Sequence, residues 1–257
     1  MTYKTFVALI VGLFMSLLSL TSAADQEKFR GKVLKFSGDV EVVDAKGEAR
    51  VVKQADEALN EMDTIVTKKG AKIVVQFDDG ALSVLDEKSR LRVEKTSWFS
   101  YLGGKVYFTF KKVFGNGESR RIKTRAATLG IRGTTFIISD NEKGESVALK
   151  EGLLDVESNG PVFEIHKQKI MDEFSQFKQQ HEQAQQDMKD EFEQYKQQAT
   201  GEFIEYRQQF TLQPNRIIKL SGYRVDEAEM NDANKADFES FESEADDLIK
   251  QFRAKSK

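Results

Sequence analysis

The feature that most constrains the fold is a buried-strand pattern, interrupted by glycines, that runs from Arg125 to Phe136 and on into Ile137-Ile138. A second strong signal is the Asp79-Gly80 pair, which separates two apolar runs, 73–77 and 81–85. An Asp-Gly pair in this setting predicts a tight β-hairpin, because glycine accepts positive φ angles without steric cost.

The same strand-like pattern extends well beyond these two places. From Phe29 to about His166, apolar residues recur with a period close to two, and turn residues recur at short intervals. Strands do not alternate with helices as a parallel sheet would require. The region 29–160 is therefore predicted to be an all-β domain, as a solenoid, a sandwich or a barrel. After the loop signal at Gly160-Pro161, 162–165 is a candidate for one more strand.

Composition excludes several classes of function. The chain of 257 residues has a formal net charge of −3, which gives no general attraction to nucleic acid or anionic membranes. It contains no cysteine, so disulfides, thiol catalysis and cysteine metal sites are excluded.

The N-terminus has the pattern of an export signal. Lys4 is followed by an apolar run from Phe6 to Leu20 and by the small residues Ser22, Ala23 and Ala24. The run is shorter than the ~20 residues of a typical membrane-spanning helix. We predict a signal peptide over 1–24, with an uncleaved anchor as the alternative. The protein is expected in the periplasm or cell envelope of a Gram-negative type bacterium.

Short motifs in the β region follow one another in a characteristic order. They are Gly31-Lys32-Val33, Leu59 to Thr67, Phe77 to Gly80, Leu102 to Val106, Ile131 to Phe136, and Glu151-Gly152. This ordered set resembles the FecR-like periplasmic domain family, and Ile131 to Phe136 is the best match, to the family's Val-Arg-Gly-Thr-x-Phe run. The resemblance implies a small β-solenoid or sandwich of FecR type. The family-signature residues, expected to be mainly structural, are Asp63, Asp79, Gly80, Arg132, Gly133, Thr134, Phe136 and Gly152.

The chain also departs from the family pattern. Met62 stands where the family usually has glycine, which puts the exact turn there in question. FecR-like regulators carry a cytoplasmic sigma-factor-binding segment and a transmembrane helix, whereas only Met1 to Thr5 precede the predicted signal peptide. We therefore expect either a soluble exported protein that uses the same β module, or signalling through a separate membrane partner.

Beyond the β region the apolar period becomes helical. A stripe spaced close to the ~3.6 residues of a helical turn runs from Ile170 to Phe210, and a segment beginning Asp172-Glu173-Phe174 recurs twice within it. We predict an amphipathic, coiled-coil-like α-helical region over 167–257, broken at Pro214, with a second helix from Asn234 to Phe252. The segment 217–223 reads as strand or loop. The candidate interaction residues on the stripe are Phe174, Phe177, Phe192, Tyr195, Phe203 and Tyr206.

The predicted helical region is acidic, unlike most helices that bind membrane surfaces. It is therefore expected to bind a protein partner or to self-associate. Little in the sequence suggests catalysis or a cofactor: His166 and His181 lack metal-ligand spacing. Asp78 and Asp79 are best explained as turn residues, and the glycines lack the strand-to-helix context of a phosphate site. No cofactor, metal site or catalytic residue is predicted.

Two surface features leave alternatives open. A basic stretch could form a groove for a polyanion, match the protein's own acidic tail, or be a solvated hairpin flank. Trp98 and Tyr101 could form an exposed aromatic lip or close the end of the β core. The basic residues are Lys111, Lys112, Arg120, Arg121, Lys123, Arg125 and Arg132.

These observations lead to one functional hypothesis and two alternatives. The hypothesis is an exported, non-enzymatic FecR-like protein that recognises or assembles with envelope proteins. The alternatives are a component of transenvelope, iron-responsive signalling, and a cell-wall glycan binder that uses Trp98 and Tyr101.

Overall fold

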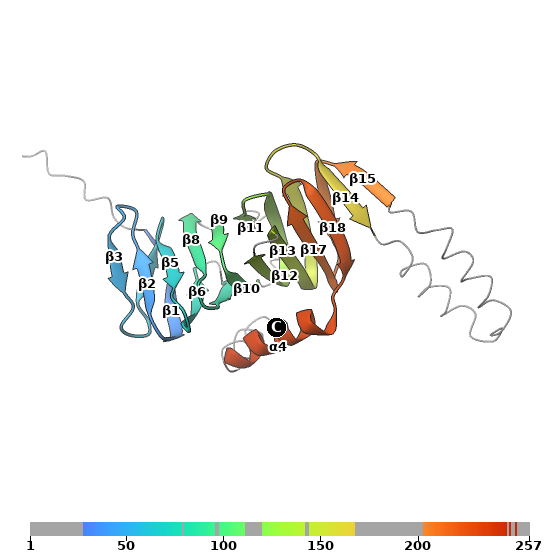
Figure 1. Ribbon diagram of the computed structural model, residues 1–257. Helices are drawn as coiled ribbons and strands as arrows, with labels where there is room; N and C mark the ends of the chain where they lie inside the picture. The colour runs from blue at the N-terminus through green and yellow to red at the C-terminus, as the bar shows by residue number, and fades with distance from the viewer. Residues whose placement is uncertain are drawn as a thin grey trace, which may run out of the picture.

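The computed structural model describes residues 28–78, 80–95, 98–110, 120–141, 144–167, 203–245, 247 and 250. Within this part of the chain, hydrogen bonds join eighteen strands into one curled β-structure, and the helix α4 (Asp232–Glu244) lies along it (Figure 1). The strand pairings form two layers that share their longest strands.

The first layer passes through the middle of the molecule and ends with the C-terminal strands. Its neighbouring strands are antiparallel, except for one parallel pair between β18 and β14. In spatial order they are β4 (Ala58–Asn60), β1 (Phe29–Ser37), β6 (Lys72–Phe77), β7 (Leu82–Leu85), β10 (Lys105–Thr109), β12 (Ala127–Asn141), β13 (Gly144–Ser158), β17 (Arg216–Ser221), β18 (Arg224–Glu229), β14 (Phe163–Lys167) and β15 (Phe203–Arg207).

The second layer starts from other N-terminal strands and meets the first at β12 and β13. Its only parallel pair within the described residues joins β9 and β11. In spatial order its strands are β3 (Ala49–Val51), β2 (Val40–Val43), β5 (Thr64–Thr67), β8 (Arg90–Lys95), β9 (Trp98–Gly103), β11 (Arg120–Lys123), then β12, β13 and β16 (Gln209–Leu212).

The main core fills the space between the layers. Phe77 on β6 and Phe99 on β9 meet with ring centroids 4.6 Å apart, so side chains of the two layers are in direct contact. Phe99 also contacts Phe108 and Phe110, with ring centroids 6.5 Å and 6.3 Å away. Such aromatic pairs add about 0.5–1.5 kcal/mol each beyond the burial of their surface. One continuous cluster of buried side chains thus includes residues from both layers.

Helix α4 covers the opposite face of the first layer. Its N-terminus is closed by a capping box, in which the Asn231 side chain accepts the backbone N–H of Asn234 and the Asn234 side chain accepts that of Asn231. Phe238 and Phe241 are buried against Tyr107 of β10, with ring centroids 6.2 Å and 5.9 Å from it. A second apolar cluster therefore lies between α4 and the sheet.

Ion pairs flank this helix–sheet contact. The Nζ atoms of three lysines on separate strands lie 2.8–3.0 Å from acidic side chains of α4. The acidic C-terminal region thus meets basic residues of the β region, but through lysines outside the basic stretch of the sequence. The pairs are Lys35–Glu244, Lys105–Asp237 and Lys150–Glu242.

The predicted fold class is wrong for the C-terminal region. Residues 203–229 form β15 to β18 and join the same β-structure, and the described C-terminal residues contribute one short helix, α4. Phe203 and Tyr206 lie on β15, a strand, and Pro214 lies in the turn between β16 and β17. The other stripe residues, Phe174, Phe177, Phe192 and Tyr195, lie outside the described residues, as does the predicted signal peptide.

The reason for this error is that β15 is held by its neighbour. All five of its residues pair with β14, from Phe163 opposite Arg207 to Lys167 opposite Phe203. Tertiary pairing of this kind overrides a local helical period, and Ile204 and the aromatic residues of the segment suit a strand. The ambiguous segment 217–223 contributes most of β17, and the predicted second helix corresponds to α4.

Candidate functional site

Most of the signature residues shape the long hairpin of β12 and β13. Both strands change register near Gly133 and Gly152, where the hairpin passes from one layer to the other. Gly133 has a φ of 61° and Gly152 a φ of 85°, values that L-residues rarely adopt. A Cβ atom on Gly152 would lie 2.4 Å from the carbonyl oxygen of Gly133. Phe136 is fully buried beyond the bend and stacks on Phe108 at 5.3 Å.

Asp63 shapes a second turn. Its buried carboxylate accepts the backbone N–H of Asn60 at 2.9 Å and a guanidinium N–H of Arg50 at 3.2 Å. Met62, within this turn, has a φ of 70°, which explains why a glycine is usual at this position of the family pattern. Asp63 is thus a structural residue.

The predicted hairpin at Asp79-Gly80 also forms, and it joins β6 to β7. Gly80 has a φ of 76°, and its N–H donates to the carbonyl of Phe77 at 3.0 Å. Asp79 itself lies outside the described residues. The neighbouring Asp78 carboxylate accepts from the buried guanidinium of Arg30 at 3.1 Å. Burial alone would lower the pKa of Arg30, but hydrogen bonds and charge from Glu61 and Asp78 raise it above its ordinary value.

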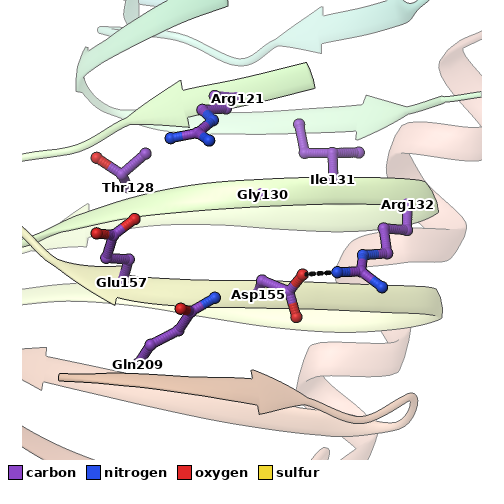
Figure 2. Close-up of a pocket in the computed structure, with 8 residues that line it drawn as sticks. All are labelled: Arg121, Thr128, Gly130, Ile131, Arg132, Asp155, Glu157 and Gln209. Carbon is purple, nitrogen blue, oxygen red and sulfur yellow. Dashed lines mark ion pairs between the residues drawn. The ribbon is translucent and has the colours of Figure 1, made fainter. Parts of the chain in front are cut away.

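Arg132 differs from the other signature residues because it is exposed. Its guanidinium forms an ion pair of 2.7 Å with Asp155 on the neighbouring strand. Both side chains line a polar groove of about 190 Å³ on the outer face of the second layer (Figure 2). The groove residues are Arg121, Thr128, Gly130, Ile131, Arg132, Asp155, Glu157 and Gln209.

Strand register sets the order of the groove residues. Across β11, β12, β13 and β16, one row consists of Arg121, Gly130, Asp155 and Thr211. Gly130 thus lies between a basic and an acidic residue, and Figure 2 shows bare backbone at this point. The next row consists of Lys123, Thr128, Glu157 and Gln209.

Some charges of the groove are paired and others are not. Asp155 accepts the Thr211 hydroxyl at 2.8 Å in addition to Arg132. The guanidinium carbon of Arg121 lies 5.3 Å from the centroid of the Trp98 ring, a cation–π contact. Within the described part of the chain, neither Arg121 nor Glu157 forms a side-chain hydrogen bond or ion pair.

A comparison with protein families finds a match in the part of the chain that contains the β12–β13 bend. Residues 63–155 match the FecR protein family. The chain contains a FecR domain. The matched range runs from Asp63 to Asp155 and includes the hairpin bend and Arg132. Glu157 and Gln209 complete the groove from outside the matched range.

Solved structures give a weaker likeness. Two crystal structures of a candidate anti-sigma factor from Parabacteroides distasonis ATCC 8503 share 14% sequence identity with the chain and align with a TM-score of 0.42. In each case the alignment covers 65% of this chain and 60% of that chain. The chain thus spans about 60% of the length of the proteins it matches. A search of the curated proteins finds no significant match.

The basic stretch does not form one continuous surface in the described residues. Arg120 is buried and lies over the Phe110 ring at 5.6 Å, and Arg125 pairs with Asp140 at 3.2 Å. Lys111 and Lys112 lie outside the described residues. The described members of the basic stretch therefore lie in separate environments, and among them Arg121 and Arg132 share the groove.

The aromatic segment of β9 closes the β core, which is the second of the two interpretations given above for Trp98 and Tyr101. Phe99 and Tyr101 are buried, and the Tyr101 hydroxyl donates to the carbonyl of Gly104 at 2.6 Å. Burial, reinforced by the negative charges of Asp140 and Glu145, raises the pKa of Tyr101. Trp98 is half-buried and in contact with Arg121. A glycan could not stack on Tyr101 in this arrangement.

A larger hollow of about 660 Å³ lies at the other end of the β12–β13 hairpin. Its buried carboxylate, Glu145, accepts the Thr124 hydroxyl at 2.8 Å and the backbone N–H of Arg125 at 3.0 Å. These bonds fix the loop between β11 and β12. The buried carboxylate of this hollow is therefore already used by the fold.

Among the described residues that line the groove there is no histidine, serine or lysine. His166 is buried on β14 with Nε2 2.7 Å from the Glu164 carboxylate, and His181 lies outside the described residues. No cluster of metal-binding side chains occurs in the part of the chain that the structure describes. In that same part, no helix is long and apolar enough to cross a membrane.

Most of the groove residues had no predicted role. Gly130 lies within the buried-strand pattern from Arg125 to Phe136, Gln209 lies within the predicted helical stripe, and no role was predicted for Asp155 or Glu157. The alternation that places Asp155 and Glu157 on an outer face is visible in the sequence. The sequence does not show which strand lies beside Asp155 and Glu157.

Proposed function

We propose that this protein is an exported, non-enzymatic FecR-domain protein that binds a protein partner in the cell envelope through its polar groove. The observation that carries the proposal is the groove itself, in which a hydrogen-bonded sheet presents the signature residue Arg132 together with Arg121 and Glu157, whose side chains form no hydrogen bond or ion pair within the described residues. A shallow surface with charges of both signs suits recognition of another polar surface. The export signal pattern of the sequence supports the envelope location.

The match to the FecR family favours one second candidate function, that of a component of transenvelope signalling. The two candidates share the same surface and differ in the partner. A periplasmic domain of an outer-membrane transporter, or a membrane regulator, would identify signalling, whereas a structural envelope protein would identify assembly.

Site-specific photocrosslinking in living cells tests the proposal. A photoreactive phenylalanine derivative replaces Gln209 or Thr128 in the groove, and Lys46, in an exposed turn far along the chain, serves as the control position. We expect discrete crosslinked products from the groove positions only, with the partner identified by mass spectrometry. Equal products from Lys46, or none from the groove, would reject the proposal.

A binding measurement with the purified partner completes the test. Arg132→Ala removes an exposed side chain and its ion pair, so the fold should be retained. If Arg132 contacts the partner, affinity should fall by about tenfold, a typical effect for a contributing interface residue. An unchanged affinity would place the partner elsewhere on the molecule.

A further inference from the structure

Gly130 lies at the centre of the groove without any structural need for glycine. Its φ lies outside the left-handed region, unlike those of Gly133 and Gly152. A Cβ atom at Gly130 would lie 3.4 Å from the Cβ of Asp155, which is an ordinary van der Waals contact. Glycine within a strand interior often marks a place where a ligand or another chain approaches closely. The missing side chain therefore points to a function of the surface.

The missing side chain leaves a slot in the row of residues that crosses the sheet. Neighbouring strands lie about 4.8 Å apart, so Arg121 and Asp155, on either side of Gly130, are separated by roughly two such spacings. Along β12 the slot is bordered by Thr128 and Arg132, which share its face because side chains alternate along a strand. Figure 2 shows these side chains around the bare backbone of Gly130.

Of the four charged residues that line the groove, one cation and one anion remain available. Arg132 and Asp155 neutralise each other at 2.7 Å. Arg121 is held by its contact with Trp98, and a guanidinium stacked on a ring keeps its N–H donors at the edge. Glu157 offers a carboxylate acceptor in the adjacent row, on the far side of Thr128.

We propose that the slot over Gly130 receives a single carboxamide side chain, glutamine or asparagine, from the protein partner. The carboxamide oxygen accepts from Arg121, and the carboxamide N–H donates to Glu157. This inference rests on the proposed function and specifies the chemistry of its partner.

Size and charge favour this guest over others. A groove of about 190 Å³ is smaller than the roughly 300–1,000 Å³ of sites for whole small molecules, so it suits one inserted side chain. A carboxylate guest would face Glu157, and an ammonium guest would face Arg121. A carboxamide carries both an acceptor and a donor without net charge.

Blocked amino acids provide the probe, because they share the same two backbone amides and differ only in the side chain. The N-acetyl N-methylamides of glutamine, glutamate, lysine and alanine are titrated into the ¹⁵N-labelled protein, and the amide resonance of Gly130 is followed by NMR. We expect saturable shifts in the millimolar range with the glutamine compound. The other three compounds should bind at least about tenfold more weakly, as sites built for hydrogen bonding reject analogues.

Variants test the two hydrogen bonds separately. Arg121→Gln and Glu157→Gln should each weaken binding of the glutamine compound severalfold, and Gly130→Val should abolish it while leaving the rest of the spectrum unchanged. Lys46→Gln is the matched control and should have no effect. Tighter binding of the glutamate compound than of the glutamine compound to the wild-type protein would show a carboxylate guest, and tighter binding of the lysine compound would show a basic one. Either result, or no shift with the glutamine compound, overturns the proposal.

The outcome can be separated from that of the proposed function. A partner that crosslinks from Gln209 while the glutamine compound fails to bind would leave the proposed function in place and reject the carboxamide slot. Binding of the glutamine compound without any crosslinked partner would reject the proposed function and leave the carboxamide slot in place.

Discussion

Replacing Gly152 by alanine should severely destabilise the fold, because the added methyl group both strains the backbone and clashes with neighbouring atoms. At a φ of 85° an L-residue is strained by about 1–2 kcal/mol. The new Cβ would also lie 2.4 Å from the Gly133 carbonyl oxygen and 2.9 Å from the Thr134 Cα, and backbone shifts forced by overpacking cost about 1–3 kcal/mol. Restricting the unfolded chain offsets about 0.4–1 kcal/mol. The net loss is then roughly 1–5 kcal/mol, a substantial part of an ordinary stability of about 5–15 kcal/mol.

Gly130→Ala is the matched control for this prediction. It lies on the partner strand of the same hairpin, but its backbone is unstrained and its Cβ would make only an ordinary contact. Removing a glycine from a strand interior should leave the stability unchanged or raise it by up to about 1 kcal/mol.

Urea unfolding, followed by circular dichroism and by the fluorescence of the single tryptophan, measures both variants. Coincident transitions by the two probes are needed before the free energies of unfolding are compared. If Gly152→Ala stays within about 0.5 kcal/mol of the wild type, or Gly130→Ala loses as much as Gly152→Ala, the distinction between the two glycines is wrong.

Further predictions concern single side chains. Met62→Gly should relieve the strain of a φ of 70° and, after the entropy gained by the unfolded chain, raise stability by about 0.5–1 kcal/mol; a lower melting temperature would contradict this. Thr134→Val should raise the free energy of unfolding by about 1–3 kcal/mol, because the buried Thr134 hydroxyl has no hydrogen-bond partner in the described structure. A lower free energy of unfolding in urea would show that the hydroxyl has a partner. Exchanging the charges of Lys150 and Glu242 in a double-mutant cycle should give a coupling of about 0.5–1 kcal/mol, since the pair is partly exposed, and the coupling should shrink in high salt. A coupling unaffected by salt would rule out a screened ion pair.

The local elements of the β region could be predicted because their signals are short-range. The Asp79-Gly80 pair predicts the hairpin of β6 and β7, and glycine chemistry at Gly133 and Gly152 marks the bend of β12 and β13. The departure at Met62 correctly drew attention to a turn with positive φ. Each of these features depends on a few consecutive residues.

The groove could not be predicted, because it depends on which strands are neighbours. Arg121 and Asp155 face the same slot only through the pairing of β11 with β12 and of β12 with β13. Gln209 enters from β16, a strand that lay within the predicted helical stripe. The prediction for the C-terminal region failed for the same reason, since β15 forms through its pairing with β14 rather than through a local pattern.

The central strands did carry a signal for the helix that covers them. A sheet with one face in water alternates apolar and polar residues, whereas a strand buried on both faces reads as a continuous apolar run. The run 73–75 and the run 136–138 are of the second kind. In each, the middle residue, Val74 or Ile137, packs in the cluster beneath α4, while its neighbours belong to the main core. Such runs require a second covering layer, and Phe238 and Phe241, on one face of α4, supply it.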